Sequence, residues 1–427
     1  MSAPLRIGIA GLGTVGAGVV RLLQTHGSLL EMRAGRPLRI TAVSARRREV
    51  DRGVDLSGYA WVEEPSTLAG RDDVDLVVEV IGGEGAAAAT IRAAVAARKP
   101  AVTANKALLA AEGVVLAAEA EAAGTVLRFE ASVAGGIPIV KALREGLAAN
   151  ATTRIAGVLN GTCNYILTEM ERTGAAYEDV LAEAQQLGYA EADPAFDVGG
   201  HDAAQKLALL ATIGFGAAVP MDALKVEGIS GVTLEDIRHA RDLGYSIKLL
   251  GIAQRAGDEL EVRMQPSFVP GSSALGLVEG VTNMVVVDAD FVGQTVHEGP
   301  GAGAGPTASA VVADIVDIAR GHGGPVFGCP AEQLTSPAIT TLGTAAPHYL
   351  RLSLDDRPGA LAEVAGALAR HGISIDRMRQ MSHETDSAPV LIVTHACVRD
   401  TLDRALEEIT ALDACGARPI AYRIEVV

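Results

Sequence analysis

The sequence predicts an α/β protein with an N-terminal parallel-sheet domain, a central α+β domain and a C-terminal βαββαβ unit. Three observations support this. Short apolar runs alternate with helical patterns over the first 130 residues, the central region mixes the two types, and the pattern restarts at residue 347. The length of 427 residues suits two to three domains, since a domain commonly holds about 150 residues.

The composition argues against a nucleic-acid or membrane partner. The 36 Lys and Arg residues face 52 Asp and Glu residues, and the net charge of −16 disfavours binding to a phosphate backbone. The uncharged and largely apolar stretch 207–221 is too short for a membrane span and contains Gly and Pro. The chain start lacks the layout of a signal peptide, and no CxxC pair occurs among the four cysteines, so we expect a reduced, cytoplasmic protein.

The first 130 residues predict a parallel sheet with helices on both faces. Apolar runs indicate strands at 5–10, 38–43, 74–81, 100–105 and 125–132. Helical patterns lie between them at 14–25, 86–97 and 107–123. Strands and helices that alternate in this way form crossover connections, which place helices over both faces of the sheet.

The remainder of the chain predicts two further domains. Within 131–305, an α+β domain, helices lie near 164–172, 177–187 and 201–213, and strands at 153–159, 259–264 and 284–288. The Gly-rich segment 299–305 leads into a helix at 306–320, which we assign to the first domain as a returning helix. Residues 321–346 predict a linker, and residues 347–427 follow the βαββαβ order of a split βαβ unit.

A glycine motif marks a dinucleotide site. It joins the first strand to the first helix and consists of Gly11, Leu12, Gly13, Thr14, Val15 and Gly16. Gly11 permits a tight turn, Gly13 lets the backbone reach a pyrophosphate, and Gly16 lets the helix approach the strand. The N–H groups at the helix start favour an anion. We expect a Rossmann-type domain over 1–130; the alternative is an ordinary Gly-rich turn.

The end of the second strand bears on the choice between NADP and NAD. NAD sites usually carry Asp or Glu there, but this chain has three arginines and no acid before Glu49. Arginine favours a 2′-phosphate through charge-assisted hydrogen bonds. We expect NADP, with Arg46 as the first candidate to bind the phosphate and Arg47 as the second. The alternative is a solvated basic loop over a site that accepts NAD.

Two segments carry ionisable groups that suit carbonyl chemistry. Lys106 follows the strand at 100–105, and ligands of open parallel sheets bind at the carboxyl ends of strands. Asp202 and Lys206 lie one helical turn apart, and the apolar run that follows predicts partial burial, where a lysine can be tuned for proton transfer. The simpler alternatives are a solvated lysine and a surface ion pair worth under about 1 kcal/mol.

The residues favour carbonyl reduction. Hydride addition leaves an alkoxide that needs a proton, and a lysine ammonium supplies both charge and proton. No GxSxG motif occurs, and the nine histidines form no HExxH or HxxxH pair that would predict a zinc site. The polar turn at 160–165 indicates little by itself.

Several long motifs in order make the chain resemble the homoserine dehydrogenases, in the monofunctional form with a C-terminal ACT domain. The matching segments are Gly11–Gly16, VVEVIGG at 77–83, TANKALLA at 103–110, FEASVAGGIPI at 129–139, LNGTCNYIL at 159–167, residues 188–211, residues 299–315 and DRPGALAEVAGALARHGISI at 356–375. The resemblance implies a reversible, NAD(P)-dependent interconversion of L-homoserine and L-aspartate 4-semialdehyde. This reaction serves threonine, methionine and isoleucine biosynthesis.

The resemblance also implies roles for individual residues. Lys206 is implied as the proton donor to the aldehyde oxygen, with Asp202 orienting it and Lys106 at the substrate or nicotinamide. Glu191 is implied to bind the substrate ammonium, with Asp197 in the polar wall. The further positions implied to line the cleft are Gly161, Thr162, Gly301 and Gly303, with Gly82 and Asn105 near the nicotinamide.

The family further implies a cation, an effector and an oligomer. A monovalent cation, usually sodium, would be bound by backbone carbonyls of Glu130, Val133, Gly135 and Ile137; the alternative is an ordinary tight turn. The turn at 358–359 in the ACT segment would bind the carboxylate of an effector, expected to be L-threonine, unless the ACT domain only forms dimers. A homodimer through the central domain, or a homotetramer through ACT pairing, is implied.

Two other functions fit parts of the sequence. An ACT-bearing 2-hydroxyacid dehydrogenase would need a catalytic His–carboxylate pair, and only His201 lies in the acid-rich segment. A non-enzymatic amino-acid sensor would bind nucleotide without turnover. Measuring NADPH oxidation with aspartate semialdehyde distinguishes all three functions.

Overall fold

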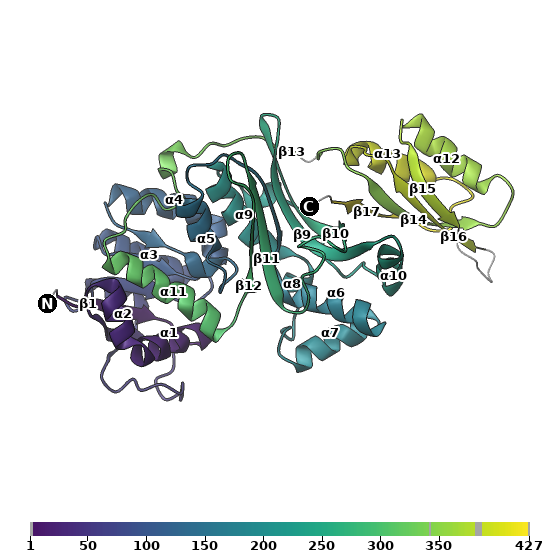
Figure 1. The fold of residues 1–427 in the computed structure, drawn as a ribbon. Helices are drawn as coiled ribbons and strands as arrows, with labels where there is room; N and C mark the ends of the chain where they lie inside the picture. Colours follow the sequence, from purple (N-terminus) through teal and green to yellow (C-terminus); the bar gives the residue numbers. More distant parts are fainter. Residues whose placement is uncertain (1–2, 341–342, 381–386, 426–427) are drawn as a thin grey trace.

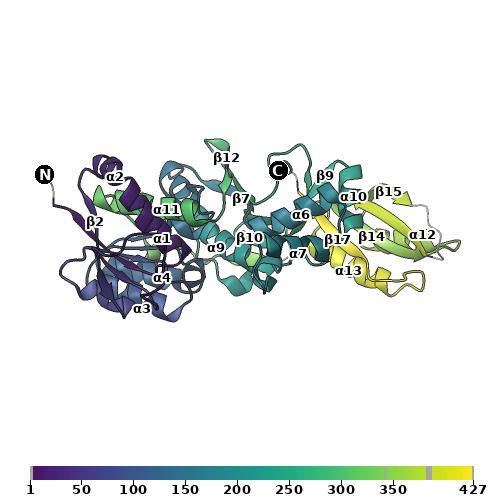
Figure 2. The ribbon, with the colours of Figure 1, turned by 90° about the horizontal axis from the view of Figure 1, so that it is seen from below.

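The computed structural model describes residues 3–340, 343–380 and 387–425. An N-terminal part, a central part and a C-terminal unit follow one another along the long axis of the molecule (Figures 1 and 2). In the described part of the chain, no helix is both long and apolar enough to cross a membrane.

The N-terminal part is a Rossmann-type parallel sheet, as predicted. Its six strands have the order β3-β2-β1-β4-β5-β6. They are β1 (Leu5–Ala10), β2 (Leu38–Ser44), β3 (Ala60–Val62), β4 (Leu76–Glu79), β5 (Ala101–Thr103) and β6 (Leu127–Arg128). One face packs on α1 (Thr14–Thr25), α2 (Gly27–Ala34) and α11 (Ala304–Ala319), and the other on α3 (Gly85–Ala96) and α4 (Lys106–Ala122). Because the strands are parallel, their carboxyl ends share one edge.

The strand predicted at 125–132 is shorter than expected. Only β6 pairs with the sheet, and a 3₁₀ turn, η2 (Glu130–Ser132), follows it. The Glu130 carboxylate accepts hydrogen bonds from the N–H groups of Val140 and Lys141, and the Glu130 N–H donates to Asp314 on α11. These side-chain bonds offer the backbone an alternative to the strand ladder, so the chain turns into the central part.

The central part is built on a mixed sheet of eleven strands, whose main path is β12-β11-β7-β9-β10-β17-β14-β16-β15. Its own strands are β7 (Thr152–Val158), β8 (Lys225–Val226), β9 (Tyr245–Ala256), β10 (Glu259–Pro270), β11 (Thr282–Ala289), β12 (Gly293–Pro300) and β13 (Ile339–Thr340). The helix α9 (His201–Phe215) packs against β7, β9 and β10. The surrounding helices are α5 (Ile139–Lys141), α6 (Gly161–Thr173), α7 (Tyr177–Gln186), α8 (Ala195–Val198) and α10 (Leu234–Asp242).

The C-terminal unit has the predicted βαββαβ order. Its elements are β14 (His348–Asp355), α12 (Ala360–Arg370), β15 (Ile375–Gln380), β16 (Ser387–Thr394), α13 (Arg399–Thr410) and β17 (Ile420–Ile424). The final two residues of the predicted last strand lie outside the described residues. The unit continues the central sheet, because β17 pairs in parallel with β10. Arg263 on β10 also donates to Glu425 at 2.5 Å, so the two parts share one hydrogen-bonded sheet.

Candidate active site

The glycine turn after β1 forms a cradle for a nucleotide. Gly11 has a φ of +102°, and a Cβ there would lie 2.4 Å from the Val80 carbonyl oxygen. A Cβ on Gly16 would lie 2.0 Å from the carbonyl oxygen of Gly11. Gly13 is the N-cap of α1, and no side chain caps the first N–H groups of this helix. These free donors and the open space beside Gly13 fit a pyrophosphate.

A cavity of about 580 Å³ extends from this cradle along the ends of β1 and β2. Arg46 and Arg47 line it together with Gly11, Leu12 and Gly13, so the structure brings the predicted arginines to the predicted glycine turn. Thr14, Val15 and Gly16 form the first turn of α1 beside it.

Arg52 also lines the cavity, and sequence reasoning missed it. Its Nε donates to the Leu12 carbonyl at 3.0 Å, and its guanidinium lies over the Trp61 ring, 5.6 Å from the centroid. Arg48 also lies over Trp61, at 5.8 Å. The feature of the sequence that could have pointed to Arg52 is the high number of arginines after β2.

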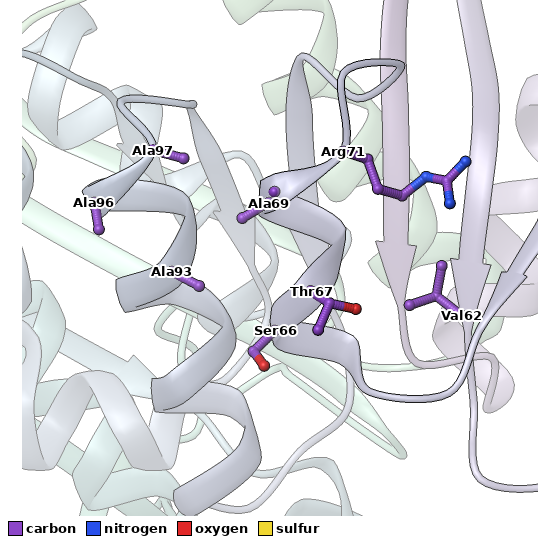
Figure 3. A pocket seen from close by; sticks show the side chains of 9 residues that line it. Val62, Ser66, Thr67, Ala69, Arg71, Ala93, Ala96 and Ala97 are labelled. Atoms are coloured by element: carbon purple, nitrogen blue, oxygen red, sulfur yellow. The ribbon is translucent and has the colours of Figure 1, made fainter.

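A larger cavity, of about 780 Å³, lies away from this site between α3 and a 3₁₀ helix, η1 (Pro65–Gly70) (Figure 3). Ala93 and Ala96 of α3, Ala97 just after this helix, and small side chains of η1 line it. Arg71 is its charged residue, and this guanidinium is engaged by Asp73 at 2.8 Å. Because none of the predicted catalytic or cofactor-binding residues reaches it, we do not place the chemistry there.

The three predicted catalytic side chains meet between α9 and the start of α4. Lys206 Nζ donates to Asp202 Oδ2 at 2.8 Å and to the Leu159 carbonyl at 2.7 Å. Lys106, the first residue of α4, places its Nζ 3.2 Å from the other oxygen, Oδ1, of Asp202. Lys206 and Asp202 are buried, whereas one third of the Lys106 side chain is exposed. Asp202 is thus shared by two ammonium groups.

Asn160 holds this cluster together, and sequence reasoning missed its role. Its Nδ2 donates to Asp202 Oδ2 at 2.9 Å and to Asp197 Oδ1 at 2.8 Å. Its Oδ1 accepts from the Cys163 N–H at 2.8 Å, which caps α6. The available signal was an asparagine just before a predicted helix, which identifies a cap but not the contacts of the amide nitrogen.

The charges in the cluster act on its two carboxyl groups in opposite directions. Burial alone raises the pKa of Asp202, but the charges of Lys206 and Lys106 and the hydrogen bonds from Lys206 and Asn160 lower it well below its ordinary value. Burial and the charge of Asp202 together raise the pKa of Asp197. Asp202 is therefore a carboxylate at neutral pH and compensates the two lysines.

A buried network at the ends of β4 and β5 positions the start of α4. The Glu79 carboxylate accepts from the Ile81 N–H at 2.7 Å and from Thr103 Oγ1 at 2.5 Å, and burial raises its pKa. Asn105 caps α4 and donates to the Gly83 carbonyl at 2.5 Å. The loop that contains Gly82 is thereby fixed beside Asn105 and Lys106.

The predicted substrate-binding residues lie around α6 and the loop before α8. A Cβ on Gly161 would lie 2.7 Å from the Val281 carbonyl oxygen, so the chain approaches closely there. Thr162 Oγ1 donates to the Tyr189 carbonyl at 2.6 Å, which ties α6 to the loop that carries Glu191. Glu191 is exposed, and its described hydrogen bond is made by its backbone carbonyl. The contacts in the described residues do not bring its carboxylate into the lysine cluster.

The Gly-rich segment before α11 is constrained by close packing. A Cβ on Gly301 would lie 1.3 Å from Asn283 Oδ1, and the Asn283 amide is itself held by the Val158 carbonyl at 2.8 Å. Gly303 is the N-cap of α11 and has a φ of +122°. Gly301 is therefore required by the close approach of the Asn283 side chain, and Gly303 by its backbone conformation.

Comparisons with known proteins support one family along the whole chain. Family models described as "Homoserine dehydrogenase, NAD binding domain", "Homoserine dehydrogenase" and "ACT domain" match residues 11–130, 138–316 and 348–414. The homoserine dehydrogenase of Neisseria gonorrhoeae is 44% identical over 425 residues, covering 98% of this chain and 97% of the relative. That of Pseudomonas aeruginosa is 40% identical over 431 residues, covering 99% of each chain.

Solved structures agree with the sequence relatives. A homoserine dehydrogenase from Thiobacillus denitrificans superposes with a TM-score of 0.94 at 42% identity, covering 99% of this chain and 98% of the other. A hyperthermophilic archaeal homoserine dehydrogenase in complex with NADPH superposes with a TM-score of 0.62 at 25% identity, covering 74% of this chain and 97% of that one.

Proposed function

The chain belongs to the homoserine dehydrogenase family, and from this premise we propose how its residues interconvert L-homoserine and L-aspartate 4-semialdehyde. The enzyme is an NAD(P)-dependent oxidoreductase of amino-acid biosynthesis. The observation that carries the residue assignment is the buried Lys206, bonded to Asp202 and to the Leu159 carbonyl. An ammonium group has three N–H donors, so one donor of Lys206 remains for a substrate oxygen.

Lys206 is the acid of the reduction. The nicotinamide, when bound, supplies the hydride that reaches the aldehyde carbon. Lys206 donates a proton from Nζ to the aldehyde oxygen as its negative charge develops, and it recovers the proton when homoserine is oxidised. Asp202 keeps the ammonium oriented, and Lys106 on its other oxygen adds positive charge beside the reacting carbonyl.

The remaining polar groups bind the amino-acid end of the substrate. The exposed carboxylate of Glu191 binds the substrate ammonium, and Asp197 supports the polar wall. The backbone at Gly161 and Thr162 lines the substrate site. The hydrogen bond from Thr162 to the Tyr189 carbonyl supports this grouping, since it holds the Glu191 loop against α6.

The cofactor is NADP, and NAD binds more weakly. Gly11–Gly16 bind the pyrophosphate, and Arg46 and Arg47 bind the 2′-phosphate at the cavity that they line with the glycines. Gly82, Asn105 and Lys106 bind on the nicotinamide side, and the backbone at Gly301 and Gly303 lines the cleft.

A sodium ion or another monovalent cation binds the carbonyls of Glu130, Val133, Gly135 and Ile137. Burial and the neighbouring charge of Asp314 raise the pKa of the Glu130 carboxyl to about 8. A cation bound at the nearby carbonyls would lower this pKa, because positive charge favours the ionised carboxylate.

L-threonine is the effector of the ACT domain, in a homodimer or homotetramer. Two contacts between the ACT unit and the catalytic part support regulation. The strand β17 pairs with β10, and Arg351 on β14 forms an ion pair with Asp236 on α10 at 2.7 Å. Through these contacts, a change in the ACT unit can reach the catalytic part. Gly359, the N-cap of α12 with a φ of +95°, lies in the turn expected to bind the carboxylate.

One experiment tests the proposal as a whole. The purified chain is assayed with aspartate semialdehyde and homoserine against NADPH, NADP, NADH and NAD, with and without sodium and threonine. We expect turnover with the semialdehyde and NADPH, and a loss of about 10²–10⁴-fold in kcat in Lys206→Met. A kcat that this substitution leaves unchanged would contradict the catalytic assignment.

A further inference from the structure

Two arginines are buried side by side at a position that the proposed function does not use. Arg128 ends β6, and Arg144 lies in the π-helical turn η3 (Ala142–Gly146). Only 3% of each side chain is exposed. Both guanidinium groups lie near the same oxygen of Glu145, so two like charges are buried close together. Buried like charges are unfavourable unless an anion compensates them.

The carboxylates near these two arginines compensate their positive charges only in part. Arg144 donates to Glu145 Oε1 from Nε at 3.2 Å and from Nη2 at 2.9 Å, and Arg128 Nη1 lies 3.7 Å from the same oxygen. The nearby carboxylates Asp314 and Asp317 are paired with Lys141, at 3.2 and 2.6 Å. Glu145 is thus the carboxylate that both guanidinium groups approach directly, and it is half exposed.

Donors also remain without acceptors. Within the described residues, Arg128 Nε and Arg144 Nη1 are buried and have no hydrogen-bond partner. Arg128 Nη2 is used by the carbonyls of His322 and Gly323, at 3.1 and 2.9 Å. Buried unpaired donors on charged groups are costly, and native proteins normally satisfy them with protein, water or an ion.

A cavity of about 350 Å³ opens at this pair. It is lined by Arg128, Arg144, Glu145, His322, Gly323, Gly324, Pro325 and Gly328. The glycines leave the backbone of the 321–328 segment uncovered by side chains, and the volume suits a small ligand. None of these residues lines the cofactor cavity or belongs to the Lys206 cluster.

We propose that this cavity is a second anion site, which binds a small phosphate-type oxyanion between Arg128 and Arg144. Two guanidinium groups match a tetrahedral oxyanion with parallel N–H donors, and the anion displaces Glu145 towards solvent as it binds. The Glu145 carboxylate is therefore a competitor for the site, and its removal strengthens binding. Acetate has one planar carboxylate and a single charge, so it satisfies fewer donors and phosphate binds in preference to it.

The test is titration calorimetry of the full chain with inorganic phosphate at constant ionic strength, with chloride as the balancing ion. All proteins carry Arg46→Ala and Arg47→Ala, which remove the proposed 2′-phosphate contacts. Phosphate binding that neither Glu145→Gln nor Arg144→Gln changes is assigned to the glycine turn of the cofactor cavity. We expect Glu145→Gln to tighten phosphate binding severalfold and Arg144→Gln to weaken it about tenfold, as expected for loss of a charge-assisted hydrogen bond. Acetate, at the same concentrations, binds more weakly than phosphate.

Three results would overturn the site: no phosphate binding above the chloride background, affinity unchanged by Glu145→Gln, or acetate binding as tightly as phosphate. If Arg144→Gln fails to fold, Glu145→Gln decides alone, because its half-exposed side chain can be exchanged without loss of a buried group. The calorimetric test measures phosphate binding and not catalytic turnover. A negative result would therefore remove the anion site without affecting the proposed reaction.

Discussion

Lys206 Nζ lies 2.8 Å from Asp202 Oδ2, and both residues are more than nine-tenths buried. A buried ion pair is weak evidence for stability, because desolvation offsets the attraction between the charges. Here the additional bonds from Asn160 and to the Leu159 carbonyl satisfy the pair and fix its geometry. This arrangement suits a proton donor that must keep one position.

Replacing Lys206 by Met should remove the proton donor while keeping most of the packing volume. We expect kcat to fall by about 10²–10⁴-fold, the usual contribution of general acid catalysis. Cofactor affinity should not change, because Lys206 does not line the cofactor cavity. Lys225→Ala is the matched control: this lysine forms a surface pair with Glu227 at 3.5 Å and should retain full activity.

Asn160→Ser separates capping from positioning. Serine can still accept the Cys163 N–H bond that caps α6, but it lacks the amide donors to Asp197 and Asp202. We expect kcat to fall about tenfold, as for loss of a hydrogen bond to a charged group, with little change in melting temperature. Asn160→Ala should add about 1 kcal/mol of destabilisation from the lost cap. Full activity in Asn160→Ser would show that the amide bridge has no positioning role.

Arg46→Ala should shift the preference between cofactors. Loss of a charge-assisted bond to the 2′-phosphate should raise KM for NADP by about tenfold or more and leave KM for NAD unchanged. Arg48→Ala is the control, since that guanidinium lies over Trp61. Steady-state kinetics with both cofactors decide the outcome, and equal losses for NADP and NAD would remove the argument for Arg46.

Gly301→Ala should destabilise the protein, because the new Cβ would lie 1.3 Å from Asn283 Oδ1. The neighbour is held by its bond to the Val158 carbonyl, so overpacking should lower the free energy of unfolding by about 1–3 kcal/mol or more. Gly305→Ala, inside α11 with open space around it, should be neutral or stabilising by up to about 1 kcal/mol. Urea unfolding of both variants tests the contrast; similar effects would contradict it.

His348 should make stability depend on pH. Burial and the charges of Arg423 and Arg399 lower its pKa to about 3, below its ordinary value of 6.5. The unfolded state therefore binds more protons between these two values, and stability is lost as pH falls below 6.5. His348→Gln should reduce this loss by up to about 1.4 kcal/mol per pH unit. Urea unfolding of the wild type and of His348→Gln, each at about pH 7.5 and about pH 5, measures how the free energy of unfolding changes with pH. An identical change in the two proteins would contradict the assignment to His348.

Local sequence patterns were sufficient for the elements whose cause is local. The strand–glycine–helix unit at 5–25 was predicted because steric demands of a tight turn fix those glycines within a few residues. The Asp202–Lys206 contact was predicted because the helical repeat places residues i and i+4 on one face. The βαββαβ order of the C-terminal unit followed from the same periodicities.

Strands at the sheet margins and junctions were harder to predict. The strand β12 was missed because it is a half-exposed edge strand with Gly and Pro and little apolar alternation. The strand β9 was missed although it pairs along its whole length with β10, and buried polar residues such as Lys248 interrupt its apolar pattern. The strand β6 was predicted too long because side-chain bonds to Glu130 compete with the ladder.

The sequence alone was enough to predict the glycine turn after β1, to identify the family, and to select Lys106 and Lys206 as the candidate catalytic lysines. Only the tertiary structure decided that Lys106 reaches the same carboxylate as Lys206, that Asn160 bridges two acids, and that β17 joins the ACT unit to β10. It also decided the burial of Arg128 beside Arg144. These contacts join distant segments, and their geometry depends on how sheets and helices pack, which the spacing of residues along a chain does not specify.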